Sequence, residues 1–443
     1  MRKNKRGKIL LAGMLTGVLI LGTGCGREAI NLQISECIGT TGLYDNNEPV
    51  ESPKMKSMRE IREREEQRQT ILQKTLEEAE QLAVMYDYEG AIKKLGEVDD
   101  EFDQDDRVVQ AKIDYQQKLS TMEAYDGDIP HIFFHSLIAD TDRAFDGDED
   151  AAGYNWWMTT VSEFNKIMEQ MYEKGYVLIN IHETVTTVEN EDGTKSYAKN
   201  MPMVPKGKKP FVLSIDDVNY YDYMQEDGFA NRLVLDGQGN VKNLYIDAEG
   251  NELVGDYDVV PLLDEFVKQH PDFSLRGARG IVAETGYEGA FGYRVNDTES
   301  PTYEEDCTAV KAIADRLRKT GWEIASHSYG HGHMKAMGYD NVVQDTDKWL
   351  DQIGTLVGET DILLYPYGEE VDYPGDKLDY LTDKGFRFLC GVWGNQEFLE
   401  VNSNYVRQTR RNFDGYTMHY NPESVKDFFN VSEVLDPERP AFE

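Results

Sequence analysis

Two adjacent carboxylates at the end of an apolar run are the first residues in this chain whose types and spacing could do chemistry. Residues 211–215, Phe-Val-Leu-Ser-Ile, have the composition of a buried strand, and Asp216 and Asp217 follow directly. α/β folds place their chemistry at the C-terminal ends of parallel strands. Because neighbouring side chains on a strand point in opposite directions, the pair can share one site only where the strand ends. This placement predicts one metal ligand and one general base; the alternative is an Asp-Asp pair that opens a solvated turn.

A second predicted strand, 322–325, also ends in metal-binding groups, His327 and His331. A spacing of four residues on the first turn of a helix puts both imidazoles on one side, where one ion can reach them. With a carboxylate from another strand they would form a two-histidine, one-carboxylate site with open positions for water and substrate. Zn²⁺ suits this ligand set, and cobalt, manganese and iron are alternatives. Two surface histidines beside a glycine-rich turn are the other interpretation, and His333 is predicted to point elsewhere.

Alternating strand and helix patterns predict the scaffold that positions these groups. Predicted strands cover 129–136, 176–182, 211–215, 278–283, 322–325, 362–365 and 386–392, and predicted helices cover 161–174, 260–269, 303–319, 342–356 and 377–383. Such alternation implies parallel strands with crossover helices, closed or nearly closed into a barrel. Two stretches, 185–199 with its Asp192-Gly193 turn and 233–253, interrupt the alternation and are predicted to be β-hairpin insertions.

The N-terminal segment predicts export. Residues 1–6 are basic, and the apolar run 9–23 is short for a membrane span, so 1–24 is predicted to be a signal peptide. Leu21-Gly22-Thr23-Gly24-Cys25 resembles the lipobox of bacterial lipoproteins, which implies a lipid on Cys25 and an extracytoplasmic, membrane-anchored protein. Ordinary signal cleavage or an uncleaved anchor is the alternative. A polar stretch, 25–53, is predicted to be a tether.

Residues 54–125 have a helical pattern and are predicted to form a short all-α stalk before a domain that covers 126–443. Within the stalk, 83–95 resembles the helix-turn-helix of a tetratricopeptide unit. Only one copy is visible, whereas solenoids need about three units for stability. The stalk is therefore interpreted as a spacer, with a protein partner bound there as the alternative.

The charge balance restricts the partners. The chain has 443 residues, 46 of them basic and 82 acidic, for a net charge of -36. This acidity argues against nucleic acid or an anionic membrane surface as a partner, and it tolerates cationic products. After Cys25, the widely spaced Cys37, Cys307 and Cys390 do not suggest a disulfide framework, and the last two are predicted to be buried thiols.

Three short motifs together resemble one enzyme family. Asp216-Asp217, His327-Ser328-Tyr329-Gly330-His331 and Tyr365-Pro366-Tyr367-Gly368 are similar to the first three motifs of the polysaccharide deacetylases of carbohydrate esterase family four, which have the NodB homology domain. Residues 129–135 and the helix that follows resemble the segment before the first motif in poly-N-acetylglucosamine deacetylases. The resemblance implies an α/β fold, a distorted (β/α) barrel of the NodB type with β-hairpin insertions, from about residue 126 to the C-terminal region.

The resemblance also implies roles for these residues. Asp217, His327 and His331 would hold the metal, Asp216 would be the catalytic base, and the backbone N–H of Tyr367 would bind the oxyanion. The division agrees with the chemistry, because a metal acidifies its bound water while a nearby unligated carboxylate takes the proton. Sugar rings could stack on four aromatic residues, Tyr220, Tyr221, Tyr365 and Trp393.

The sequence departs from the family pattern in three places, and the first two concern the surroundings of the catalytic base. Val218-Asn219 follows the aspartates where the family has glycine, and Leu364 stands where many members carry an arginine. Arg407, Arg410 or Arg411 is expected to orient Asp216 instead.

The third departure concerns the general acid, which the family takes from a histidine in its last motif. The nearest candidate is His419, although Thr417 occupies the position where an aliphatic residue is usual. His135 is the second candidate.

These residues predict a metal-dependent hydrolase that removes N-acetyl groups from amino sugars of a cell-surface polysaccharide, either poly-N-acetylglucosamine-like or peptidoglycan. One alternative keeps the site and changes the substrate to an O-acetyl ester on a polysaccharide. The other is a catalytically inactive, glycan-binding envelope lipoprotein.

Overall fold

The structure is a computed structural model that describes residues 52–99, 102–191, 195–393 and 397–442. Contacts divide the chain into two compact units, 1–63 and 64–443. The predicted signal peptide, Cys25, Cys37 and the Asp192-Gly193 turn lie outside the described residues, and the division at residue 126 stays a prediction.

The N-terminal helices form as predicted. They are α1 (Pro53–Val84), α2 (Tyr88–Leu95) and α3 (Asp106–Leu119), and the strand β1 (Met122–Ala124) follows. The turn before α2 is closed by Asp87, whose side chain accepts a hydrogen bond from the Gly90 N–H. Small apolar residues of α1, Ala79 and Ala83, share a core with Ala91 and Leu95 of α2.

One ten-stranded sheet forms the centre of the second unit, in the order β15-β16-β14-β13-β12-β11-β7-β2-β17, with β3 paired to β7. All its pairings are parallel except that of β15 with β16. The strands are β2 (His131–Phe134), β3 (Tyr176–Leu178), β7 (Lys209–Ile215), β11 (Ile281–Glu284), β12 (Glu323–Ser326), β13 (Ile362–Leu364), β14 (Phe388–Gly391), β15 (Leu399–Val401), β16 (Val406–Thr409) and β17 (Arg411–Asn412).

The sheet curls into a distorted barrel, and the chain itself brings its two sides together. β16 pairs with β14 on one side, β17 pairs with β2 on the other, and only Arg410 separates β16 from β17. Because consecutive Cα atoms lie about 3.8 Å apart, the two sides must meet at this residue. The predicted α/β barrel is therefore present, and its closure point is Arg410.

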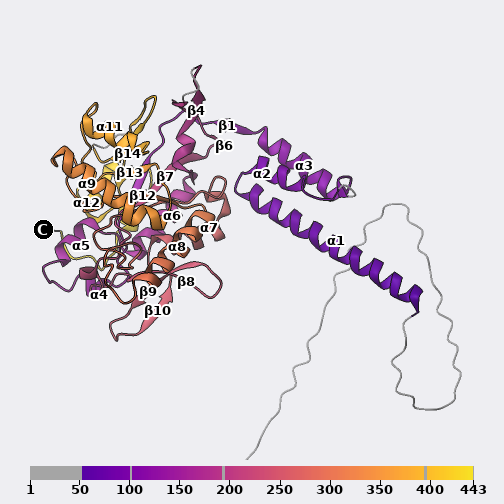
Figure 1. The fold of residues 1–443 in the computed structure, drawn as a ribbon, viewed down its shortest axis with the longest axis horizontal. Coiled ribbons are helices and arrows are strands. Elements are labelled where there is room, and N and C mark those ends of the chain that lie inside the picture. Colours follow the sequence, from indigo (N-terminus) through magenta and orange to yellow (C-terminus); the bar gives the residue numbers. More distant parts are fainter. Residues whose placement is uncertain (1–51, 100–101, 192–194, 394–396, 443) are drawn as a thin grey trace, which may run out of the picture. The chain divides into compact units, whose positions relative to one another are not determined.

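Helices cover the outer face of the sheet (Figure 1). Outward-facing residues such as Leu213 and Ile215 share one core with Phe164, Leu263 and Val310 from three of these helices. The α-helices that follow β1 in the chain are α4 (Thr141–Ala144), α5 (Ala151–Trp157), α6 (Val161–Glu173), α7 (Val259–Gln269), α8 (Tyr303–Lys319), α9 (Tyr339–Trp349), α10 (Thr355–Val357), α11 (Asp376–Asp383), α12 (Gly415–Tyr420) and α13 (Val431–Val434).

Several predicted elements have different bounds in the structure, and two of them show how. The strand predicted for 176–182 ends at Leu178, because the Asn180 side chain accepts from the His182 N–H and starts a 3-10 turn there. The helix predicted for 342–356 begins earlier, at Tyr339, and continues through a π turn, Leu350–Gly354, into α10.

Both insertions are present. β4 (Val185–Glu189) and β5 (Lys195–Lys199) form the first predicted hairpin. The second is a three-stranded meander, β8 (Arg232–Leu235), β9 (Val241–Ile246) and β10 (Glu252–Gly255). A short strand, β6 (Met203–Pro205), pairs with β1. Cys307 and Cys390 are buried free thiols, as predicted.

Candidate active site

The two aspartates reach one cleft because the strand ends where the sequence predicts. β7 stops at Ile215, and Asp217 has a φ of 59°, a left-handed conformation that turns the chain away from the strand path. The departure at Val218-Asn219 also has a structural explanation. The Asn219 side chain donates to the Gly289 carbonyl at 2.6 Å and accepts from the Thr285 N–H at 3.0 Å, so an amide bridge to the next loop supports this turn.

The two histidines also meet, but the predicted helical turn is wrong. The segment after β12 is an irregular loop in which Ser328 and His331 have positive φ values of 60° and 49°. Its backbone is held by Asp345 of α9, whose carboxylate accepts from the N–H groups of Tyr329 and Gly330, each at 2.8 Å. The imidazole centroids of His327 and His331 lie 5.0 Å apart.

Asp217, His327 and His331 form a group that fits a metal ion. One ligand atom from each residue lies within 4.8 Å of the others. Buried His327 places Nδ1 2.7 Å from the Leu364 carbonyl oxygen, so this nitrogen donates its proton and Nε2 keeps a free lone pair. The Tyr221 hydroxyl donates to Oδ1 of Asp217 at 2.6 Å, while Oδ2 lies 3.7 Å from His331 Nε2. One carboxylate and two neutral imidazoles are a donor set that zinc accepts.

Asp216 occupies a different environment. It is buried, and its Oδ1 accepts from Arg410 Nη1 at 2.6 Å. Burial alone would raise the pKa of this carboxyl group, but the charge of Arg410 and its hydrogen bond hold that pKa well below its ordinary value. Among the three arginines considered, Arg410 therefore orients Asp216. Arg407 pairs with Glu370, and Arg411 pairs with Glu397.

Tyr367 also lines this cleft. It has a φ of 57°, a left-handed backbone conformation. Its exposed side chain stacks on His333, with ring centroids 4.0 Å apart. His333 also contacts Glu369 at 3.0 Å, so it lies outside the metal group, as predicted.

His419 does not reach the cleft. Its side chain is exposed on α12 and stacks on Phe442, with centroids 4.2 Å apart, because the short helix turns this position away from the barrel. It lines a separate hollow with Met418 and Lys426. The second candidate, His135, lines the cleft, and its buried Nδ1 has no hydrogen-bond partner among the described residues.

The cleft has a volume of about 580 Å³. Its aromatic lining differs from the prediction, because Tyr220, Tyr221 and Tyr365 are buried below it and Trp393 packs against Arg407 in a neighbouring hollow. The exposed rings at the cleft come from other elements, two α-helices and two 3-10 helices: Trp157, Tyr416, Tyr223 and Tyr367. Sequence periodicity could not separate these from packing residues, since both kinds lie at strand and helix ends.

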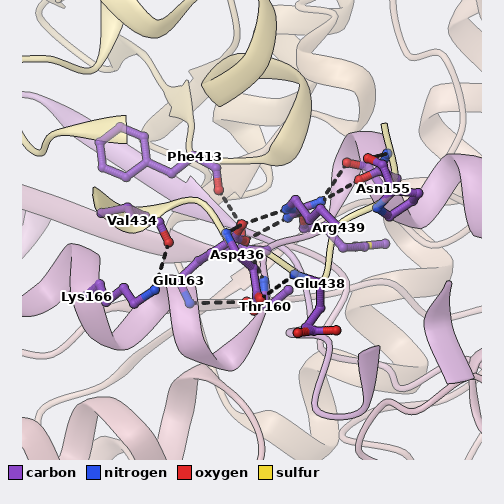
Figure 2. A network of polar contacts seen from close by, with 12 residues as sticks. Asn155, Thr160, Glu163, Lys166, Phe413, Val434, Asp436, Glu438 and Arg439 are labelled. Carbon is purple, nitrogen blue, oxygen red and sulfur yellow. Dashed lines mark hydrogen bonds and ion pairs between the residues drawn. The ribbon is translucent and has the colours of Figure 1, made fainter. Parts of the chain in front are cut away.

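A buried polar network joins the C-terminal segment to α5 and to the start of α6 (Figure 2). Glu163 at the start of α6 accepts from Arg439 Nε at 2.6 Å, and both side chains are almost fully withdrawn from solvent. Arg439 also donates to the carbonyl oxygens of Asn155 and Met158 at 2.8 and 2.7 Å. These residues flank Trp157, whose ring stacks on Tyr416 at 5.4 Å. The C-terminal segment therefore fixes an aromatic wall that no local pattern predicts.

The comparisons with known proteins agree with the motifs. Residues 291–389 match the family described as "Polysaccharide deacetylase". This match includes His327, His331 and Tyr367, and it does not reach Asp216 or Asp217. No curated protein matches the chain.

Several solved structures are similar to parts of the chain. The deacetylase PplD of Streptococcus pyogenes in complex with acetate has 12% identity and a TM-score of 0.36, over 70% of this chain and 99% of that one. The BpsB deacetylase domain of Bordetella bronchiseptica has 12% identity and a TM-score of 0.35, over 65% and 98%. A pseudoenzyme of carbohydrate esterase family four from Bacillus anthracis, BA3943, has 14% identity and a TM-score of 0.22, over 40% and 60%. Likenesses of this degree leave the function to be inferred from the site.

Proposed function

We propose that this protein is a metal-dependent hydrolase that removes N-acetyl groups from the amino sugars of a cell-surface polysaccharide. The observation that carries the proposal is the convergence of Asp217, His327 and His331, from two separate strand ends, beside the buried carboxylate of Asp216. The family match over 291–389 supports the same reaction class. The aromatic rim supports a sugar substrate, because apolar ring faces of sugars pack on exposed aromatic side chains.

In the proposed mechanism, Asp217, His327 and His331 hold Zn²⁺ or another divalent transition metal. When bound, such an ion acidifies water and polarises the acetamide carbonyl. Asp216, kept ionised by Arg410, accepts the proton of the attacking water. The Tyr367 N–H donates to the oxygen that becomes negative in the tetrahedral intermediate. His135 takes the place of His419 as the group that protonates the departing amine.

Acetate release from defined polymers tests this proposal. We expect the zinc-loaded protein to release acetate from poly-N-acetylglucosamine or from peptidoglycan, and Asp217→Ala to lose both the bound metal and the activity. Asp340→Ala, which changes an exposed carboxylate on α9, is the matched control and keeps both. Release only from an O-acetylated polymer would make the protein an esterase. Stoichiometric metal without turnover on any acetylated polymer would make it a glycan-binding protein.

Export and lipid anchoring remain part of the proposal. The lipobox-like segment ending at Cys25 supports them, and it lies outside the described residues. Among the residues that the structure describes, no helix has both the length and the apolar character needed to cross a membrane. Incorporation of labelled palmitate into the protein in a bacterial host, and its loss in Cys25→Ser, tests the anchor. Labelling that persists in the variant would contradict it.

A further inference from the structure

A chain of buried polar side chains runs through the barrel interior beneath Asp216. His131 of β2, Ser214 of β7, Gln408 of β16 and Arg410 are each no more than 2% exposed. They lie next to one another because the strand β7 is flanked by β2, and because β16 leads into the closure of the sheet at Arg410. Polar groups buried this deeply are costly unless each one is hydrogen-bonded.

Within this group of four side chains, one assignment of donors and acceptors satisfies every hydrogen bond. Gln408 Nε2 donates to the Ile129 carbonyl at 3.4 Å, so its Oε1 faces His131 Nδ1 at 3.2 Å as an acceptor. His131 therefore carries its proton on Nδ1 and accepts at Nε2 from the Ser214 hydroxyl at 3.0 Å. The Ser214 oxygen is then free to accept from Arg410 Nη1 at 3.3 Å.

This assignment requires His131 to be neutral. A proton on Nε2 would remove the acceptor of the Ser214 hydroxyl proton, and the other polar contact of this oxygen among the described residues is with Arg410, which can only donate. The protein environment agrees, because burial and the Arg410 charge lower the pKa of His131 to about 3. The Nε of Arg410 is buried without a partner among the described residues, and its polar contacts with Ser214 and Asp216 both use Nη1. Its guanidinium carbon also lies 4.4 Å from the centroid of the Phe133 ring.

We propose that Ser214 and His131 are positioning residues for the deacetylation reaction, holding Arg410 so that it fixes the carboxylate of Asp216. The inference rests on the proposed function, since Asp216 is the base of that reaction. Neither residue lies in the cleft lining, so neither touches the substrate. They act through Arg410 alone.

Ser214→Ala tests the proposal with little change in volume. We expect kcat to fall about 10-fold or more, the usual effect of removing a group that orients a reacting side chain, with KM and metal content unchanged. Ser214→Thr keeps the hydroxyl and is expected to restore most of kcat. Ser274→Ala is the matched control: Ser274 is equally buried and donates to the Ala278 carbonyl at 2.6 Å, far from Arg410 in the chain, so its kcat stays at the parent value.

A double substitution tests whether Ser214 acts through Arg410. In an Arg410→Lys background, Ser214→Ala is expected to lower kcat much less than in the parent, because the group it positions is absent. An equal fall in both backgrounds, or a parent-like kcat in Ser214→Ala, would overturn the proposal.

Nuclear magnetic resonance of protein labelled with ¹⁵N-histidine gives a readout that needs no turnover. The His131 signal, assigned from its loss in His131→Gln, is expected to show the neutral tautomer with the proton on Nδ1 from about pH 6 to 8, where an ordinary histidine titrates. A protonated ring, or a neutral ring with its proton on Nε2, would overturn the proposed positioning role even if the enzyme is active. If the parent protein releases no acetate, the proposed function is overturned instead. The spectrum then still tests whether His131 and Ser214 have the proposed hydrogen-bond arrangement.

Discussion

Asp216 and Asp217 are neighbours in sequence with different surroundings, and their substitutions should separate two functions. Asp216→Asn is expected to retain the metal and to lower kcat by about 10²- to 10⁴-fold, the usual contribution of a general base. Metal analysis together with acetate release measures both. Circular dichroism should accompany them, because the variant leaves the buried Arg410 without its carboxylate. Loss of metal in this variant would reverse the two assignments.

Tyr221 is buried below the cleft and does not form the predicted sugar-stacking wall; its hydroxyl instead contacts Asp217, the proposed metal ligand. Its hydroxyl donates to Asp217 at 2.6 Å, so Tyr221→Phe should weaken zinc binding about 10-fold or more. Equilibrium titration against a competing chelator measures this. Tyr154→Phe removes a similar buried hydroxyl, bonded to Asp227 at 2.6 Å, and is expected to leave zinc affinity unchanged. Equal zinc affinities of the parent and of Tyr221→Phe would contradict a role of Tyr221 in metal binding.

At the scale of elements, the C-terminal segment is expected to be essential for stability. Arg439→Met leaves Glu163 as an unpaired buried charge, which should lower the free energy of unfolding by about 3–5 kcal/mol. Lys426→Met breaks a solvent-exposed pair with Glu423 and should leave the free energy of unfolding nearly unchanged. Denaturant unfolding measures both. A small effect of Arg439→Met would mean that the segment is not docked as observed.

For the whole molecule, one histidine makes stability depend on pH. His182 joins the 3-10 turn Ile181–Thr184 to Glu323 of β12 and to Asp361 just before β13, with its ring nitrogens 2.7 and 3.0 Å from their carboxylates. Partial burial opposes the charge, but these carboxylates raise the pKa of His182 to about 10. A pKa raised above the unfolded value, about 6.5, stabilises the fold fully below that pH. The contribution is lost as pH rises through 10.

The measurement is the difference in free energy of unfolding between the parent and His182→Gln as a function of pH. It should be largest near neutral pH and below, and should shrink toward zero as pH rises from about 7 to 10. A difference that does not change over this range would contradict the paired, protonated state.

The net charge of -36 predicts a salt effect on product binding. Deacetylation exposes amines, and an acidic surface attracts such cations more strongly at low ionic strength. The inhibition constant of a glucosamine oligomer should therefore rise with added salt, whereas that of its acetylated counterpart should stay nearly constant. A product affinity that does not weaken in salt would show that the acidic surface does not attract the product.

The sequence by itself determined the order of strands and helices and the positions of the motif residues. Helix α8 has the predicted bounds, and Asp216 lies at a strand end, because periodicity and strand-end polarity are local properties of the chain. The convergence of Asp217, His327 and His331 was anticipated for the same reason, since parallel strands end at one edge of a sheet.

Only the tertiary structure decided which distant side chains support these groups. From the sequence, Arg407, Arg410 and Arg411 are equally good candidates to orient Asp216. In the structure Arg410 contacts this carboxylate, because the sheet closes at that residue. His135 lines the cleft and His419 does not, because the short helix α12 turns position 419 outward. Such choices depend on which strands meet when the barrel curls, and no spacing within a single segment encodes that meeting.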